Sequence, residues 1–448
     1  MINTLLKIFF VILYISLPLC CEVYSADSGT REDGKDYLPP DASLSQIVAY
    51  AVRNNPAVQS SYALVLAEHD KIDQKKALPD PRVTYGYFFE EVETRVGPQE
   101  HRFGVQQTLP WPGKLFTEYV QARKSHEKMV FMHGAVVNET VFKIKEACFE
   151  YWYITQLILI TENNKKLLEQ FEEVARSKYS TGSISHADYI NAQVELAKID
   201  NQLISVQDRK PVQEAYINTV LNREYDEAVP SPEHFLVETQ EIPAEQELLL
   251  IMRKHNPSLQ ALELDIEEKQ HAVDRSRQNF IPDVTLGVDY IATDDALMRG
   301  TRDSGKDPVI GMVSVTIPLW ANKYSAAVNE HQNMYHNAIE QRASLENTLI
   351  SELQRAVYQA KDTQRRVTLY KDVLLRQAKD AYSVTEQLFA SGKASFLDYI
   401  NTQRTLLDLE RECVRAQADY NKFLAQIEKI IGKEIWFHAY EFEVPEPE

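Results

Sequence analysis

Glycine and cysteine are scarce in this chain, which has 14 glycines and four cysteines among 448 residues. So few glycines exclude a collagen-like chain and a chain made of glycine-rich linkers. Cys20 and Cys21 lie at the end of an N-terminal apolar run, so Cys148 and Cys413 are the two that remain for the folded protein. Two cysteines are too few for a disulfide framework, and we expect both to be buried free thiols.

Basic side chains are outnumbered by acidic ones, 48 against 66, which gives a net charge of −18. This charge would repel a phosphate backbone over most of the surface, so we expect no nucleic acid among the partners. The 11 histidines show no metal-ligand spacing, and no set of nucleophile, base and orienting residue can be assembled. The sequence therefore predicts no enzyme activity, no catalytic residues, no bound metal and no cofactor.

Proline is missing from two long stretches. None of the 19 prolines lies between Pro112 and Pro211, and none lies between Pro318 and Pro445. Proline is the main breaker of helices, so both stretches are free to form very long ones.

The N-terminus has the pattern of a secretory signal. Lys7 is followed by an apolar run over residues 8–19 and then by a short stretch with small residues. The run is shorter than the roughly 20 residues that a spanning helix needs. We predict a signal peptide over residues 1–25, and the alternative is that Cys20 or Cys21 carries a lipid, although the residues before them are not the small ones expected there.

The rest of the chain is a duplication. Residues 179–196 match residues 389–406 at an offset of 210, and Asn55-Pro56 matches Asn256-Pro257 at an offset of 201. The predicted parts of the chain are an irregular segment (26–42), a first repeat (43–222), a linker (223–244), a second repeat (245–432) and an acidic tail (433–448).

Each repeat contains two short segments in which apolar residues alternate with polar ones, as in a β-strand. In the first segment Val83, Tyr85, Tyr87 and Phe89 share one face. We predict β-hairpins over residues 82–109 and 283–317, with polar loops at 93–100 and 292–308.

These strands suit either a soluble sheet on a core or a membrane barrel, and their periodicity does not choose between the two. Trp111 and Trp320 follow the strands where an aromatic girdle would lie, which favours the membrane. Four strands cannot close a membrane barrel, so a membrane-inserted chain would have to oligomerise.

The proline-free stretches 114–180 and 322–390 are each predicted to form one helix, of roughly 100 Å at 1.5 Å per residue. Each ends near a glycine and is followed by a serine and an aspartate that suit a helix start. The returning helices carry apolar residues spaced by three and four, which predicts antiparallel coiled pairs. The sequence thus gives each repeat a helical hairpin with a tight tip.

Together, the signal peptide, the duplicated halves, the strand pairs and the tip pattern Gly-x-x-Ser-x-x-Asp-Tyr-Ile-Asn-x-Gln resemble the TolC-type outer-membrane efflux family over essentially the whole mature chain. The runs at 78–81 and 107–115 are similar to that family's strand-boundary motifs. The Pro-Trp-Pro-Gly-Lys run within the second is most similar to the heavy-metal branch.

The resemblance implies a mainly α fold with membrane β: long antiparallel coiled hairpins that form an α-barrel, and four strands per chain that contribute to a trimeric, twelve-stranded outer-membrane β-barrel. It implies a homotrimer in outer-membrane lipid that extends into the periplasm, where it meets an adaptor protein coupled to an inner-membrane pump.

The resemblance also assigns roles to residues. Asp398 falls where the family has an acidic ring at the tunnel mouth, and Asn401 departs from members that have a second aspartate there. Asp188 and Asp398 also suit the plain role of helix-start charges. The predicted gate residues are Asp398, Asn401, Asp188 and Asn191; the predicted adaptor-docking residues are Tyr179, Gly182, Ser185, Phe389, Gly392 and Ser395; and the predicted membrane-interface belt is Trp111 and Trp320.

The function expected from this reading is a passive, tip-gated exit duct of a tripartite exporter, carrying metal cations or small toxic compounds. One alternative is the outer duct of a type I protein secretion system. An alternative of another class is a periplasmic coiled-coil scaffold or adhesin, whose strands would form a soluble sheet.

Overall fold

The computed structural model of the chain describes residues 38–438. The predicted signal peptide with Cys20 and Cys21, most of the predicted irregular segment and the end of the acidic tail lie outside the described residues. The elements described below all lie within Pro40–Glu448.

Both repeats contain two helices, two strands and a long helical hairpin, in the same order. The first repeat consists of α2 (Leu44–Asn54), α3 (Pro56–Lys76), β1 (Arg82–Thr94), β2 (Gly97–Leu109), α4 (Pro112–Ser180) and α5 (His186–Leu221). The second consists of α6 (Glu245–His255), α7 (Pro257–Arg277), β3 (Asp283–Thr293), β4 (Val309–Thr316), α8 (Ala321–Leu369), α9 (Leu375–Ala390) and α10 (Phe396–Ile431). Short 3-10 turns, η2 (Pro232–His234) and η3 (Gln278–Phe280), lie in the linker and before β3.

The long outgoing helices differ between the repeats. α4 is one uninterrupted helix of 69 residues, as its lack of proline predicts. The stretch 322–390 also runs as one continuous helix, but it contains a π-helical turn, η4 (Tyr370–Leu374), between α8 and α9, which was not predicted. From Pro318 to Gly392 is 392 − 318 = 74 residues, against 182 − 110 = 72 from Pro110 to Gly182. A π turn holds more residues than an α turn, so it takes up extra length without ending the helix.

The four strands form one antiparallel sheet in the order β1-β2-β3-β4. The register places Val83 opposite Val105 and Val105 opposite Val288, so the predicted apolar residues of all strands fall on one face. These side chains are largely exposed. On the other face Arg102 of β2 donates from Nε to the buried Asp289 of β3, at 2.7 Å.

The predicted polar loop at 93–100 is wrong, because strand pairing continues through most of it. After an irregularity in the register, Val92 pairs with Gln99 and Thr94 with Gly97, leaving a turn of two residues. Gly97 has a φ of 136°, which suits glycine. Hydrogen bonds between paired strands are made by backbone groups, so a run of polar side chains does not by itself end the pairing. The loop between β3 and β4, by contrast, runs from 294 to 308 and agrees with the prediction to within two residues.

The repeated Asn-Pro pairs join the helices of each repeat. Asn55 accepts a hydrogen bond from the first turn of α3 and donates to the carbonyl of Val220, 2.8 Å away near the end of α5. Asn256 in the same way accepts from the first turn of α7 and donates to Ile430 near the end of α10, also at 2.8 Å. One side chain thus caps the start of one helix and the end of another.

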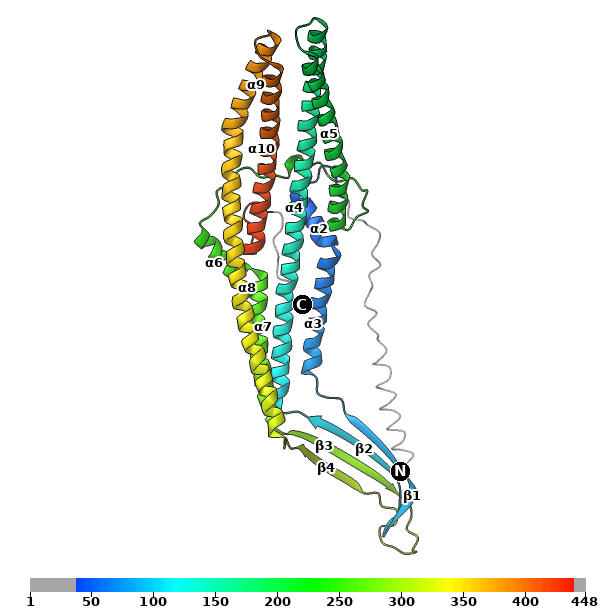
Figure 1. Ribbon diagram of the computed structural model, residues 1–448. Helices are drawn as coiled ribbons and strands as arrows, with labels where there is room; N and C mark the ends of the chain where they lie inside the picture. The colour runs from blue at the N-terminus through cyan, green and yellow to red at the C-terminus, as the bar shows by residue number, and fades with distance from the viewer. Residues whose placement is uncertain (1–37, 439–448) are drawn as a thin grey trace. The chain divides into compact units, whose positions relative to one another are not determined.

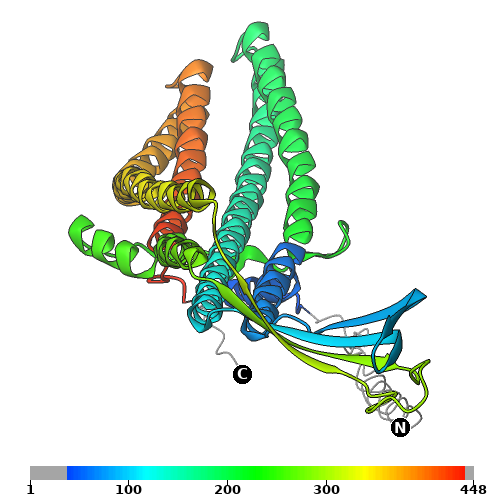
Figure 2. The same ribbon diagram turned by 90° about the horizontal axis from the view of Figure 1, so that it is seen from below.

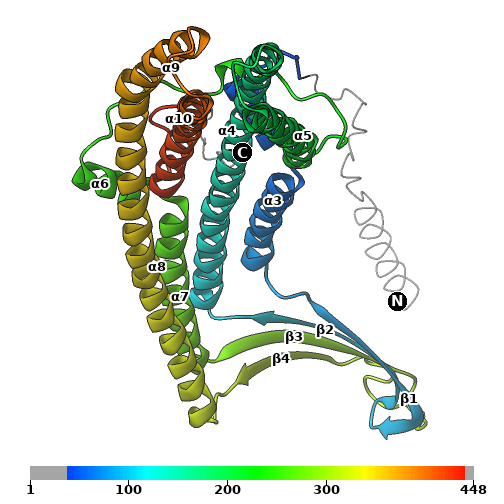
Figure 3. The same ribbon diagram turned by 45° about the horizontal axis from the view of Figure 1, so that its top comes forward.

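The hairpins and the sheet lie at opposite ends of α4 (Figure 1). α4 packs against α3, α7, α5 and α10, and α7 packs against α8. Figure 3 shows α3, α4, α7 and α8 running side by side towards the sheet, and Figure 2 shows α4/α5 and α9/α10 as two separate helix pairs. Within residues 38–438, no helix is long and apolar enough to span a membrane.

Cys148 and Cys413 are both buried free thiols, as predicted. Burial raises the pKa of each thiol above its ordinary value, so the reactive thiolate is disfavoured in the folded chain.

Candidate gate and docking tips

Both hairpin tips are closed by the same backbone turn. At the first tip Gly182 has a φ of 71°, its N–H donates to the carbonyl of Tyr179 at 3.0 Å, and the N–H of Ser183 donates to Lys178 at 2.8 Å. At the second, Gly392 has a φ of 76° and makes the corresponding bond to Phe389 at 3.1 Å. This pattern is a Schellman motif, in which glycine occupies the left-handed position.

A capping box starts each returning helix, as predicted from the serine and aspartate. Ser395 Oγ donates to Asp398 Oδ2 at 2.6 Å and accepts from the Asp398 N–H at 3.1 Å. Ser185 and Asp188 make the same two bonds, at 2.7 and 3.1 Å. The carboxylates therefore do fill the plain role of helix-start charges.

The Asp398 carboxylate is exposed and remains charged under mildly acidic conditions. The hydrogen bonds from the hydroxyl and the N–H of Ser395 lower the pKa of this carboxyl below its ordinary value of 3.8. Asn401, one turn further along α10, and Asn191 at the matching position of α5 are also exposed. Of the four predicted gate residues, Asn191, Asp398 and Asn401 are therefore exposed to solvent in a single chain, and Asp188 is partly exposed.

The predicted docking aromatics have different surroundings. Tyr179 is partly exposed and stacks on Tyr189 with ring centroids 5.6 Å apart. Phe389 is buried and lies 5.2 Å from Phe171 of α4. Lys178 of the first tip donates to the carbonyl of Phe389 at 3.0 Å. The two tips of one chain are thus joined to each other, a contact that sequence reasoning missed because it links the two repeats.

An ion pair joins the hairpins further from the tips than that contact. Arg404 of α10 donates from Nε to Glu195 of α5 at 3.1 Å. Although burial opposes it, hydrogen bonds from Arg404 and Lys198 lower the pKa of the Glu195 carboxyl. The pair therefore stays ionised at neutral pH.

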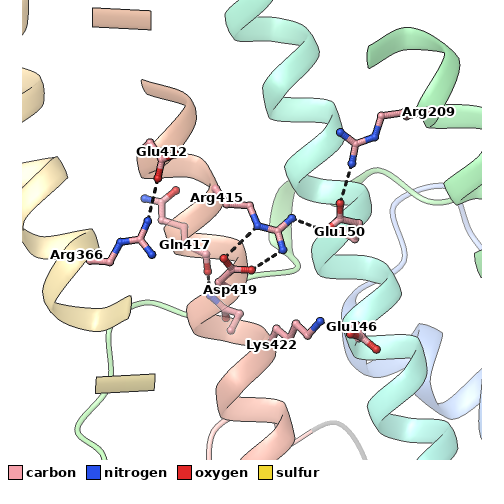
Figure 4. A network of polar contacts seen from close by, with 10 residues as sticks. Glu146, Glu150, Arg209, Arg366, Glu412, Arg415, Gln417, Asp419 and Lys422 are labelled. Atoms are coloured by element: carbon pink, nitrogen blue, oxygen red, sulfur yellow. Dashed lines mark hydrogen bonds and ion pairs between the residues drawn. The ribbon is translucent and has the colours of Figure 1, made fainter. Parts of the chain in front are cut away.

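A second group of ion pairs lies nearer the middle of the hairpins (Figure 4). Arg415 of α10 donates to Glu150 of α4 at 2.8 Å and to Asp419 of its own helix at 2.6 Å. Lys422 pairs with Glu146 across the same gap. A cavity of about 270 Å³ lies between these side chains. Each charged side chain that lines this cavity pairs with one of opposite charge, so we interpret the group as a structural contact between α4 and α10.

Trp111 and Trp320 lie at the junctions between strand and helix, directly before α4 and α8. They are 49% and 74% exposed. The role of both residues in a membrane-interface belt stays a prediction. Among the described residues, no group of three or more His, Cys, Asp or Glu side chains is placed to hold a metal ion.

Comparison with known proteins agrees with this architecture. The family model of outer membrane efflux proteins matches residues 248–433. The cobalt-zinc-cadmium resistance protein CzcC of Cupriavidus metallidurans is 22% identical over 328 residues, which cover 72% of this chain and 74% of that protein.

The fold is that of outer-membrane channels. VceC of Vibrio cholerae superposes with a TM-score of 0.73 at 16% identity, covering 87% of this chain and 96% of that one. The open state of the MtrE channel of Neisseria gonorrhoeae gives 0.70 at 15% identity, covering 87% and 89%. Residues 248–433 thus match the family of outer membrane efflux proteins, and the chain shares the fold of solved outer-membrane channels.

Proposed function

We propose that three copies of the chain form a passive exit duct, gated at the periplasmic tips, for a tripartite exporter with an adaptor and an inner-membrane pump. The main support for this proposal is the sheet. It has an exposed apolar face, and its two edge strands are β1 and β4. Edge backbone groups cannot stay unpaired in lipid. Pairing β4 of one copy with β1 of the next satisfies both edges and closes a barrel.

The helices support the same assembly. On α3, the exposed residues Tyr62 and Leu66 lie one turn apart and form an apolar edge. Val212 of α5 and Tyr358 of α8 are 71% and 69% exposed. In a closed ring α3 and α5 of one copy meet α8 and α9 of the next, which removes these side chains from water. Three copies give the twelve strands that the family resemblance implies.

For the cargo, we propose metal cations or small toxic compounds. The support is the relative CzcC, a cobalt-zinc-cadmium resistance protein. A strain lacking this chain should become more sensitive to divalent metal ions than to drugs and detergents, measured as minimal inhibitory concentrations. The reverse order would remove metals from the proposal and leave the duct itself in place.

Assembly gives the first test. The full chain should appear in the outer-membrane fraction and migrate on gels as a trimer that heating converts to a monomer, because twelve-stranded closure leaves no free edge. A monomer in the soluble periplasmic fraction would contradict the duct and favour the coiled-coil scaffold.

Gating gives the second test. Replacing Asp398 by alanine should raise the single-channel conductance in planar bilayers, because three carboxylates leave the mouth. Ser395→Ala is the control, since it removes the bond between Ser395 Oγ and Asp398 Oδ2 that Asp398→Ala also removes, and it keeps the charge. Because the folded pKa is depressed, the charge is present above the ordinary value of 3.8 and lost only as pH falls through the lower folded value. Wild-type conductance should therefore stay constant from neutral pH down to about 4, and rise below it. Equal conductance of Asp398→Ala and wild type would remove the gating role.

A further inference from the structure

One stripe of α4 lines a row of three hollows between the neighbouring helices. Ser125, Met132, Glu139 and Glu146 are spaced by seven residues, so they lie on nearly the same side of the helix. Ser125 lines the first hollow, of about 360 Å³, and Glu146 lines the third, of about 270 Å³. Met132 and Glu139 line the second, of about 760 Å³, which we call the α4 groove.

The α4 groove differs from the other two hollows in its chemistry. Glu68, Glu118 and Arg275 are among the charged side chains that line the first hollow, and the third is lined by ion pairs (Figure 4). The groove lies along α4 and α7, and its size and mainly apolar walls are those of a site for a small molecule. The apolar side chains that form these walls include Met132, Ala135, Val136, Ala261, Leu262 and Leu345.

The charged side chains at the α7 edge of the groove are already paired. Lys128 of α4 donates to Asp265 of α7 at 2.9 Å, and it also pairs with Glu268. Although burial opposes it, the hydrogen bonds to Glu268 and Asp265 raise the pKa of the Lys128 ammonium above its ordinary value. This group therefore stays ionised and paired at neutral pH.

The charges on the α4 side of the groove are paired as well. Glu139 pairs with Lys143 at 3.5 Å and with Lys429 of α10. Although burial opposes it, the hydrogen bond from Lys429 lowers the pKa of the Glu139 carboxyl. A charged ligand would lose its water in the groove and meet no unpaired opposite charge, so the groove suits an uncharged one.

The opposite side of α4 is covered by the chain itself. Val141 lies nine residues after Met132, which is a rotation of about 180° around the helix, and it is buried, as is Val130. α2 packs against α4 and does not line the groove. In the proposed duct, covering elements on the inner side would fill the lumen. The covered side is therefore the outer one, and the α4 groove faces the lumen.

We propose that the α4 groove binds uncharged, apolar small molecules as they pass along the lumen. Removing the apolar surface of such a molecule from water supplies the affinity, and the flexible thioether of Met132 adapts to different shapes. The inference rests on the proposed duct for the place of the groove in the lumen. It also narrows the proposed cargo, because this site takes apolar compounds and not metal cations.

Protection of an introduced cysteine tests this. Val136→Cys places a thiol in the groove wall, and Val174→Cys, at an exposed position further along α4, is the matched control. Cys148 and Cys413 are buried, and burial raises the pKa of both thiols, so they should not react with a water-soluble maleimide. The full chain is held in lipid nanodiscs, where no detergent competes for the groove. The probe is the uncharged dye phenylnaphthylamine, and the lipophilic cation tetraphenylphosphonium is the comparison.

At ten times its dissociation constant, the dye should slow the modification of Val136→Cys about tenfold and change that of Val174→Cys less than about twofold, because only free groove reacts. The cation at the same concentration should protect much less. Adding Ala135→Phe, which puts a ring into the groove, should abolish the protection by the dye.

Three results would overturn the inference. They are no protection at the solubility limit of the dye, equal protection by the cation, and a Val136→Cys thiol that is unreactive without any probe, which would mean that another segment or copy covers the groove. Gel migration of the same sample separates this outcome from the fate of the duct. Heat-sensitive trimers without protection would remove the groove alone, whereas a soluble monomer would remove the duct and with it the role of the groove in transport.

Discussion

Replacing Lys145 by methionine is expected to lower the free energy of unfolding by about 3–5 kcal/mol. The Lys145 side chain lies in α4 with 1% of its surface exposed. Its ammonium donates to Glu428 of α10 at 2.9 Å and to Glu434 at 2.5 Å. Without the ammonium, two carboxylates remain in the interior with no opposite charge.

The consequence extends to the segment after α10, because Glu428 holds that segment. Glu428 Oε1 accepts from the backbone N–H groups of Ile435 and Trp436, both at 2.7 Å. If the Glu428 side chain turns away, these donors lose their acceptor. We expect a lower urea midpoint by far-ultraviolet circular dichroism in detergent, together with faster proteolysis of the C-terminal segment.

Lys143→Met is the matched control. Lys143 lies two residues away on α4, is exposed, and pairs with Glu139 at 3.5 Å. Exposed pairs contribute about 0–1 kcal/mol, so this variant should unfold almost as the wild type does. Similar losses for Lys143→Met and Lys145→Met would show that the buried pair has no special role.

Local features of this fold were predictable from sequence. Gly182 and Ser185 define a tip because a left-handed cap and a capping box each depend on neighbours within a few residues. The face of β1 that carries Val83 and Tyr85 followed from a period of two. The end of β1 at Thr94 could not be predicted from this pattern, because backbone pairing continues past the last alternating apolar residue.

Contacts between distant segments could not be predicted in the same way. Asn256 contacts Ile430, 174 residues further along the chain, and Gln403 contacts Asn164 over 239 residues. The repeated Asn-Pro pair was visible in the sequence, yet its double-capping role needs the end of another helix to be in place. The duplication did offer a signal for this role, because a residue that occurs at a helix start in both repeats indicates the same structural role in each. The buried cluster around Phe171 of α4 left no such signal, because the second repeat has Ala381 at the position of Phe171.

Replacing Gly432 by alanine is expected to cost about 2–5 kcal/mol, the sum of a left-handed backbone penalty of about 1–2 and an overpacking term of about 1–3. Gly432 ends α10 with a φ of 73°. A Cβ there would lie 2.3 Å from the carbonyl oxygen of His255 and 2.8 Å from Cα of Asn256. These are backbone atoms at the start of α7, so no side-chain rotation relieves the contact.

The expected damage is the separation of the end of α10 from the junction between α6 and α7, since moving the backbone near Asn256 also breaks its 2.8 Å bond to Ile430. Gly392→Ala at the tip separates the two terms: its φ is 76°, yet no heavy atom of the described residues lies within 4 Å of the added Cβ. That variant should show the backbone penalty alone, so its urea midpoint should fall by much less than that of Gly432→Ala.

The first repeat has Asn222 at the matching position, with a φ of 56°, so the corresponding turn after α5 accommodates a side chain. Equal midpoints for the two alanine variants would mean that α10 and α7 separate without cost, and that Asn256 does not hold this joint.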